Sequence, residues 1–161
     1  MNTSEYNHAV EQWADHLFRF ALKLCKNQIT AEDLVQEAFA TMWEHRNKVP
    51  VEKAKPYLFQ VLYRKFIDIY RYQQRWTGLD VVSDIQTSYE DPQPDIREVI
   101  ERALHQLPPP QKAVIMLRDW EGYSYREIGA ITGLSASQVK VYLFRARKKM
   151  KELLVDISNI Q

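Results

Sequence analysis

Hydrophobic residues in the first half of the chain recur every three or four positions in three long stretches, a period typical of amphipathic helices. The first stretch, residues 5–26, predicts a helix that buries Val10, Trp13, Ala14, Leu17, Phe20, Ala21 and Leu24. The second opens at Thr30, with Asp33 in the third position of a capping box, and buries Leu34, Val35, Ala38, Met42 and Trp43. After a proline-containing loop over residues 46–56, the third spans residues 57–74 with a stripe of Leu58, Val61, Leu62 and Ile69.

Aromatic and basic side chains alternate around the third predicted helix. Its rings are Tyr57, Phe59, Tyr63, Phe66, Tyr70, Tyr72 and Trp76, interleaved with Arg64, Lys65, Arg71 and Arg75. One helix cannot bury all of these rings. Ring faces can stack on unpaired bases while cations follow the phosphates, which is typical of single-strand binding. The alternative is that most rings complete the core of a three-helix bundle. We expect both, with Leu58, Leu62, Phe66 and Ile69 in the core.

Helical periodicity resumes in the second half of the chain. Asp95 is placed to cap a helix with apolar positions at Ile96, Val99, Ile100, Ala103, Leu104 and Leu107. Three consecutive prolines, residues 108–110, end that helix, because proline lacks the amide and clashes with the preceding turn. Pro110 can begin the next helix, which is expected to bury Ala113, Val114, Met116 and Leu117.

Residues 123–151 contain two helix starts close together. Ser124 with Glu127, and Ser135 with Gln138, each fit the capping box in which a hydroxyl and an acid or amide satisfy free amides at a helix start. Gly133 between them supplies the backbone freedom that a sharp turn requires. The pattern predicts a helix-turn-helix.

The last predicted helix has one buried stripe and one basic surface. Val139, Leu143, Ala146, Met150 and Leu153 form the stripe, and the outward surface holds Lys140, Arg145, Arg147, Lys148, Lys149 and Lys151. A solvated surface helix is the alternative to DNA contact. However, residues 135–151 contain no acid to pair with these cations, so we favour a helix that enters a DNA major groove.

Charge is segregated along the chain although the 161 residues carry a net charge of only +1. Residues 76–96 contain five acids and no base, and residues 76–94 have no sustained apolar period, which predicts an acidic interdomain linker. This linker could lie over one of the basic surfaces. The second predicted helix is acidic outside its buried stripe, and its residues alone fit equally a docking face for a basic partner helix and an ordinary solvated helix.

Several functional classes are excluded by what the sequence lacks. The single cysteine, Cys25, excludes an internal disulfide and is expected to be a buried structural thiol. The four histidines lack metal-ligand spacing, and there is neither a phosphate-cradling glycine loop nor a nucleophile with a base, so we expect no metal, no cofactor and no enzyme activity. No run is long and apolar enough to span a membrane, and the start lacks a signal peptide, so a cytoplasmic protein without direct membrane insertion is expected.

Three segments together resemble the extracytoplasmic-function (ECF) sigma factors of bacterial RNA polymerase. AEDLVQEAFATMWE and PYLFQVLYRKFIDIYR are similar to the family's region two, and the segment from LPPPQKAV to RARKKMKEL is similar to region four. The resemblance covers nearly the whole chain. It implies an all-α fold of two small helical domains: a region two bundle of three to four helices in residues 1–75 and a region four helix-turn-helix domain in residues 95–161, joined by the linker, residues 76–94. It also implies promoter-specific transcription initiation.

The resemblance assigns roles to residues that match the family's motifs. It implies that the core polymerase clamp helices are bound by Asp33, Leu34, Gln36, Glu37, Phe39 and Trp43, which favours docking over the solvated alternative. Melted minus-ten DNA would be contacted by Lys53, Lys55, Tyr57, Tyr63, Arg64, Lys65, Arg71 and Arg75. Minus-thirty-five duplex would be contacted by Tyr125, Arg126, Ser135, Ser137, Lys140, Val141, Phe144, Arg145, Arg147 and Lys148.

Further partners and two departures follow from the same resemblance. It makes an anti-sigma factor an expected partner and a small-molecule substrate unexpected. Arg64 stands where the family more often has asparagine, and Gly129 replaces a frequent alanine, at a cost of up to ~1 kcal/mol in helix propensity.

Two other functions remain as alternatives. A dimeric helix-turn-helix repressor or activator would read a palindrome with half-sites about one turn apart, whereas a sigma factor reads two unlike elements. A helical adaptor would not bind DNA at all.

Overall fold

The computed structural model describes residues 1–77 and 95–159, and within these the side chains of residues 77 and 157–159 are not described. The acidic linker proposed for residues 76–94, and with it the hypothesis that it covers a basic surface, lies almost entirely outside this range. The chain divides into two compact units, and each is described by itself. No helix in the described ranges is long and apolar enough to cross a membrane.

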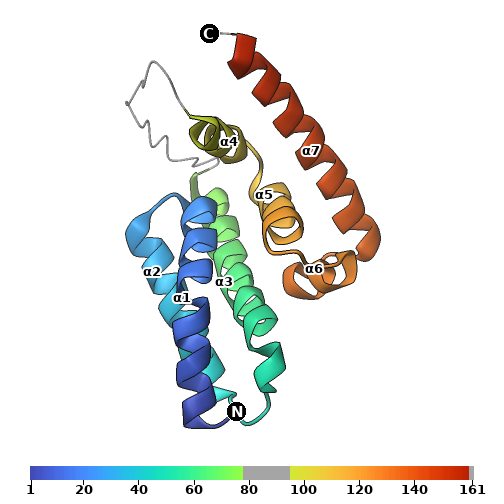
Figure 1. Ribbon diagram of the computed structural model, residues 1–161. Coiled ribbons are helices and arrows are strands. Elements are labelled where there is room, and N and C mark those ends of the chain that lie inside the picture. Colours follow the sequence, from blue (N-terminus) through green and yellow to red (C-terminus); the bar gives the residue numbers. More distant parts are fainter. Residues whose placement is uncertain (78–94, 160–161) are drawn as a thin grey trace. The chain divides into compact units, whose positions relative to one another are not determined.

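The first unit is a bundle of three long helices, α1 (Thr3–Cys25), α2 (Gln28–Glu44) and α3 (Ala54–Thr77), with a short 3₁₀ helix, η1 (Val51–Lys53), before α3. Each long helix packs against the other two (Figure 1). Leu17, Leu34, Met42, Phe59 and Leu62 are almost completely buried, and the rings of Phe20 and Phe59 meet edge to face with centroids 5.0 Å apart. Apolar burial between the helices therefore holds this unit together.

Two predicted helix starts in this unit were wrong. Asn27, and not Thr30, caps α2: the Asn27 side chain accepts a hydrogen bond from the Thr30 amide, at 3.0 Å. The helix α3 begins at Ala54, three residues before the predicted start, because Pro56 falls in its first turn, where a missing amide costs nothing.

Cys25 is only half-buried, and its thiol donates to the Asn27 carbonyl, at 3.3 Å.

The buried stripe of α3 also differs from the prediction. Leu58, Leu62 and Phe66 are buried as expected, but Ile69 is 38% exposed. Phe59, Tyr63 and Ile67 are buried in addition. Because α3 packs against both α1 and α2, it buries a wider stripe than a helix with one neighbour, and that stripe is rotated away from Ile69.

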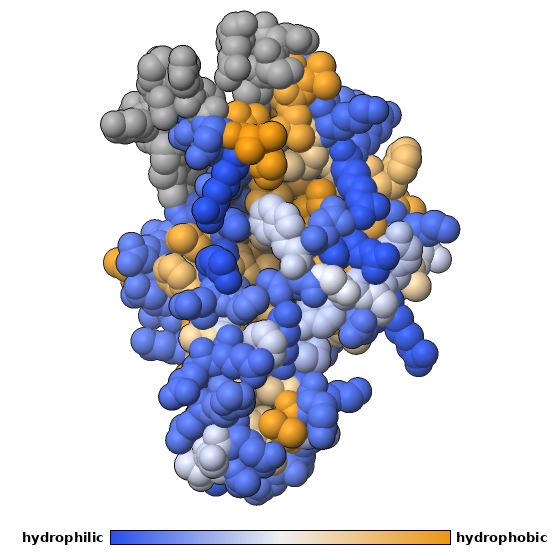
Figure 2. All heavy atoms as spheres, viewed as in Figure 1, coloured by the Kyte–Doolittle hydropathy of each residue, from blue (hydrophilic) through white to orange (hydrophobic). Residues whose placement is uncertain are grey.

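The second unit contains α4 (Ile96–His105), α5 (Pro109–Ile115), most of α6 (Tyr125–Thr132) and α7 (Ala136–Asn159). The predicted core residues Ala113, Val114, Met116 and Leu117 are buried, and so are four of the five stripe residues of α7, Val139, Leu143, Ala146 and Met150. Asp95 caps α4 through the Glu98 amide, at 2.9 Å, as predicted. Figure 2 shows hydrophobic residues gathered over α4 and the nearby part of α7.

A feature that the sequence did not predict is a π-helical turn, η2 (Met116–Trp120), which continues from α5. The Glu121 amide donates to the Met116 carbonyl, five residues back, at 3.1 Å, and the Tyr123 amide donates to the Leu117 carbonyl, at 3.0 Å. The wider turn carries the chain directly into the start of α6.

Candidate nucleic-acid interface

Reciprocal hydrogen bonds fix both helix starts of the helix-turn-helix. The Ser124 hydroxyl accepts from the Glu127 amide at 3.1 Å, while the Glu127 carboxylate accepts from the Ser124 amide at 3.0 Å. Ser135 and Gln138 repeat the arrangement at the start of α7, at 3.1 and 2.9 Å. Both predicted capping boxes are confirmed. Each capping box gives hydrogen-bond acceptors to two backbone amides that would otherwise have none within the helix, and so fixes where the helix begins.

The turn between α6 and α7 depends on two glycines. Gly133 has a φ of +82°, in the left-handed region, and its amide donates to the Gly129 carbonyl at 2.8 Å. A Cβ atom on Gly129 would lie 2.8 Å from the carbonyl oxygen of Leu134, closer than such atoms approach in folded proteins. The close approach of the backbone in this turn therefore requires glycine at position 129, although glycine lowers the helix propensity there.

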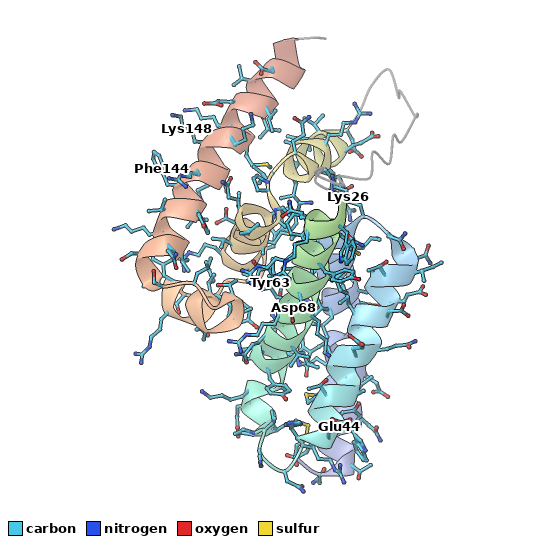
Figure 3. All side chains as sticks on the ribbon, turned by 180° about the vertical axis from the view of Figure 1, so that it is seen from behind. Lys26, Glu44, Tyr63, Asp68, Phe144 and Lys148 are labelled. Carbon is cyan, nitrogen blue, oxygen red and sulfur yellow. The ribbon has the colours of Figure 1, made fainter. Side chains whose placement is uncertain are left out.

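The outer surface of α7 presents cations and an apolar ring together. Lys140, Val141, Arg145 and Lys148 are exposed, and Phe144 is 69% exposed. Figure 3 shows Phe144 and Lys148 projecting away from the body of their unit. Ser135 and Ser137 are exposed at the start of the same helix. A major groove offers phosphates for the cations and thymine methyl groups for apolar side chains.

Arg147 is engaged inside the second unit. Its guanidinium pairs with the carboxylate of Asp119 in η2, with Nη2 to Oδ1 at 2.5 Å and Nε to Oδ2 at 3.4 Å. This hydrogen bond raises the pKa of Arg147. The pair ties α7 to the π-helical turn, a role that its place in the basic run did not predict. Contact between Arg147 and phosphate stays a prediction.

Arg118 and Tyr125 form a second link near the start of α6. The Arg118 guanidinium donates to the Tyr123 carbonyl at 2.9 Å and lies 4.9 Å from the centre of the Tyr125 ring. Tyr125 is consequently half-buried, whereas its neighbour Arg126 is exposed. Of these two predicted phosphate contacts, Arg126 is the more accessible.

The acidic face of α2 in the first unit lies mostly as predicted. Asp33, Gln36 and Glu37 are exposed and Phe39 is half-buried. Leu34, however, is 1% exposed, so its assignment to a docking surface was wrong. It packs beneath the face as part of the core. Ile29, one helical turn before Asp33, is 71% exposed, and periodicity gave no signal for it because it falls outside the apolar stripe.

Trp43 at the other end of this face is held by two neighbours. Its ring meets Tyr6 edge to face at 4.8 Å, and the Arg46 guanidinium lies 3.9 Å from its centre. The Tyr6 hydroxyl donates to the Phe39 carbonyl at 2.9 Å, and burial raises the pKa of Tyr6. Trp43 thus keeps a fixed orientation while 37% exposed.

The predicted minus-ten residues separate into accessible and covered groups. Lys53, Arg64, Arg71 and Arg75 are exposed, and Lys55, Tyr57 and Lys65 are half-buried. Lys55 lies 4.7 Å from the centre of the Trp13 ring. Burial, together with the charge of Glu44, raises the pKa of Tyr57. Tyr63 is 3% exposed, so its assignment to base contact was wrong: its ring completes the bundle core.

Comparison with known proteins identifies the family. Residues 9–76 match the family described as Sigma-70 region 2, and residues 97–150 match Sigma-70, region 4. The chain is 30% identical over 148 residues to the ECF RNA polymerase sigma factor SigM of Bacillus subtilis (strain 168), covering 89% of this chain and 91% of that protein. This chain belongs to the ECF RNA polymerase sigma factors.

Further relatives agree with this membership. The sigma factor is 33% identical over 140 residues to RNA polymerase sigma factor SigV of Bacillus subtilis (strain 168), covering 83% of this chain and 81% of that one. It is also similar to the sigma factor RpoE solved in complex with the anti-sigma factor NepR from Bartonella quintana, with a TM-score of 0.77 and 25% identity over 94% and 98% of the two chains. The all-α fold with sigma regions 2 and 4 is confirmed, and the protein directs transcription initiation by RNA polymerase.

Proposed function

We propose that this ECF sigma factor recognises a promoter through two separate surfaces, a minus-thirty-five element as duplex and a minus-ten element as melted strand. The observation that carries the proposal for the minus-thirty-five element is the outer surface of α7. Two reciprocal hydrogen bonds between Ser135 and Gln138 fix the start of this helix. Its outer surface is basic, contains no acid up to Lys151 and exposes Phe144 among the cations. Lys140, Val141, Phe144 and Arg145 would contact bases or sugars, and Arg126, Ser135 and Lys148 are suited to phosphates.

The second surface would lie on α3 and the segment before it. Lys53, Arg64, Arg71 and Arg75 are exposed there and can follow the phosphates of a separated strand. Opening the duplex costs a few kcal/mol per unstacked step, and aromatic stacking returns ~1 to 3 kcal/mol per base, so binding energy alone can drive it. The chain would therefore open the promoter without catalysing a reaction itself.

The acidic face of α2 is proposed to dock on the clamp helices of core RNA polymerase. Asp33, Gln36 and Glu37 offer two carboxylates and an amide, and Trp43 offers a partly exposed ring in a fixed orientation. Carboxylates suit a basic partner, and a held ring loses little entropy on binding. An anti-sigma factor is a further proposed partner, supported by the RpoE relative that was solved with one.

The domain limits proposed with these roles are residues 1–75 for docking and the minus-ten element, residues 76–94 for the linker, and residues 95–161 for the minus-thirty-five element. As a partner of polymerase on the chromosome, the chain is proposed to work in the cytoplasm.

Reconstituted transcription tests the proposal. Purified core RNA polymerase would be supplied with fragments of the source chromosome, with and without the full chain, and start sites would be read by sequencing. We expect defined starts only when the chain is present, preceded by two unlike elements. A shared palindrome would instead support a dimeric helix-turn-helix regulator, and an absence of defined starts would refute sigma activity.

A further inference from the structure

The structure separates the aromatic rings of α3 by how much of each ring is covered. Phe59, Tyr63 and Phe66 are buried. The Tyr70 ring stacks on Phe66 with centroids 6.0 Å apart, and its hydroxyl accepts from the Gln74 amide group at 2.7 Å. Only the last two rings of the helix are largely free: Tyr72 is 61% exposed and Trp76 is 75% exposed. Tyr57, near the other end of α3, is half-buried, so base stacking by α3 is expected to fall mainly on Tyr72 and Trp76.

Tyr72 and Trp76 lie one helical turn apart and form a pair. Their ring centroids are 6.0 Å apart, with planes at 53°. That separation is wider than the ~3.4 Å between stacked bases of one strand. Two successive bases that stacked on the two rings would therefore belong to an extended strand. The same helical side carries Ile69, 38% exposed, which adds apolar surface next to Tyr72.

The charges around the pair favour a polyanion. Arg71 and Arg75 are both exposed and each directly precedes one of the two rings. The one acid of α3, Asp68, lies a turn before Tyr72, and residues 69–77 contain no other acid. Large aromatic side chains exposed side by side are unusual on a surface that binds nothing. Alternating rings and cations match the bases and phosphates of a single strand.

We propose that Tyr72 and Trp76 form a stacking platform for unpaired bases of promoter DNA, with Arg71 and Arg75 binding the adjacent phosphates. This platform rests on the proposed function of the first unit and replaces Tyr63 as its base-contacting ring. It lies at the carboxyl end of α3, away from the segment of residues 53–57 that the sequence pointed to. Melted DNA would accordingly follow the length of α3.

The test uses the full chain and a fluorescein-labelled single strand of mixed sequence, with its matched duplex, in a fluorescence anisotropy titration at one salt concentration. Replacing both rings, Tyr72→Leu with Trp76→Leu, should weaken single-strand binding about tenfold or more, as expected for the loss of stacking on two bases, and leave duplex binding nearly unchanged. The conservative pair Tyr72→Phe with Trp76→Phe should retain most of the affinity. Trp120→Leu, a partly exposed ring of the second unit, is the control and should change neither.

Three results would overturn the platform: no single-strand binding by the wild-type chain, equal weakening for single strand and duplex, or an unchanged single-strand affinity in the leucine variant. If that last result came with a loss of core polymerase binding, the rings would belong to a protein interface. Circular dichroism verifies that the variants fold. Start-site selection by the wild-type chain tests the proposed function separately, so it can stand while the platform fails.

Discussion

Glu37 on α2 and Lys65 on α3 lie side by side, with Oε2 and Nζ 3.7 Å apart. Glu37 belongs to the proposed polymerase-docking face and Lys65 to the proposed minus-ten surface, so the two surfaces adjoin along α2 and α3. Their side chains are 56% and 39% exposed, and such a pair stabilises the fold by no more than about 1 kcal/mol. Both charges therefore remain available to partners at little cost in stability.

Reversing the charge at Glu37 should abolish binding to core polymerase. Glu37→Lys places a cation in a face proposed to meet a basic partner, while the exposed position keeps the bundle folded. Co-purification with core polymerase measures the effect. Glu11→Lys, the same change at an exposed position of α1, should bind normally. The swap Glu37→Lys with Lys65→Glu restores the ion pair and should still fail to bind; recovery of binding would mean that the pair matters and not the face.

Arg145→Ala should weaken binding to duplex that contains the minus-thirty-five element and relax specificity at the contacted position, by about 1 to 3 kcal/mol. Lys148→Ala, at a proposed phosphate contact, should instead weaken binding uniformly and lower the salt slope by about one. Both are measured on duplexes selected from a random pool by the wild-type chain. Arg97→Ala removes an exposed cation of α4 and serves as the control. If it matched Arg145→Ala, general charge and not a specific site would explain binding.

Replacing Gly133 should destabilise the helix-turn-helix through the backbone alone. A Cβ atom there would meet no other atom within 4 Å, but the φ of +82° is unfavourable for other residues. Gly133→Ala should lower the free energy of unfolding by about 1 to 2 kcal/mol, and Gly133→Asn by less, because asparagine tolerates this conformation better. Urea unfolding of the second unit followed by circular dichroism measures both. Equal losses for the two variants would show that conformation is not the cause.

Tyr123 should make the second unit sensitive to alkaline pH. Burial, assisted by the charges of Glu121 and Glu127, raises the pKa of Tyr123 far above its ordinary value. In the unfolded chain the phenol has a pKa of about 10, and well below that pH it is protonated in both states, so it does not change the free energy of unfolding. Above that pH the unfolded chain loses the proton first, so the free energy of unfolding falls as pH rises. The fall between about pH 8 and pH 11 should be smaller in Tyr123→Phe, as urea unfolding would measure. An identical fall would exclude Tyr123 as a cause.

The pair of Asp119 and Arg147 should hold the π-helical turn against α7. Asp119→Ala removes a two-point contact that is partly exposed, so a loss of about 1 kcal/mol or less is expected. A double-mutant cycle with Arg147→Ala isolates the pair by thermal unfolding. A coupling energy near zero would show that the contact does not stabilise the unit. If the freed Arg147 of Asp119→Ala binds phosphate, duplex affinity should rise in the same variant.

Features of the molecule that depend on local contacts were predicted correctly from the sequence. Ser124 and Glu127 are three residues apart, as are Ser135 and Gln138, so their hydrogen bonds form within one turn of chain. The start of α2 was wrongly predicted at Thr30, since Asn27 offers a competing cap three residues earlier. The acid-free run of α7 and the acidic face of α2 were likewise visible as patterns, and their roles came from the family resemblance.

The sequence by itself determined the order of the main helices, both capping boxes of the helix-turn-helix, most of the buried stripe of α7 and the resemblance to the ECF sigma factors. Tertiary structure decided which side chains are accessible. Tyr63 and Leu34, predicted at binding surfaces, lie in the core, and Ile69, predicted in the core, is exposed. Arg147 pairs with Asp119. The reason is physical. Capping depends on neighbours within one turn, whereas burial of a ring on α3 depends on α1 and α2, which the chain brings against it from many residues away.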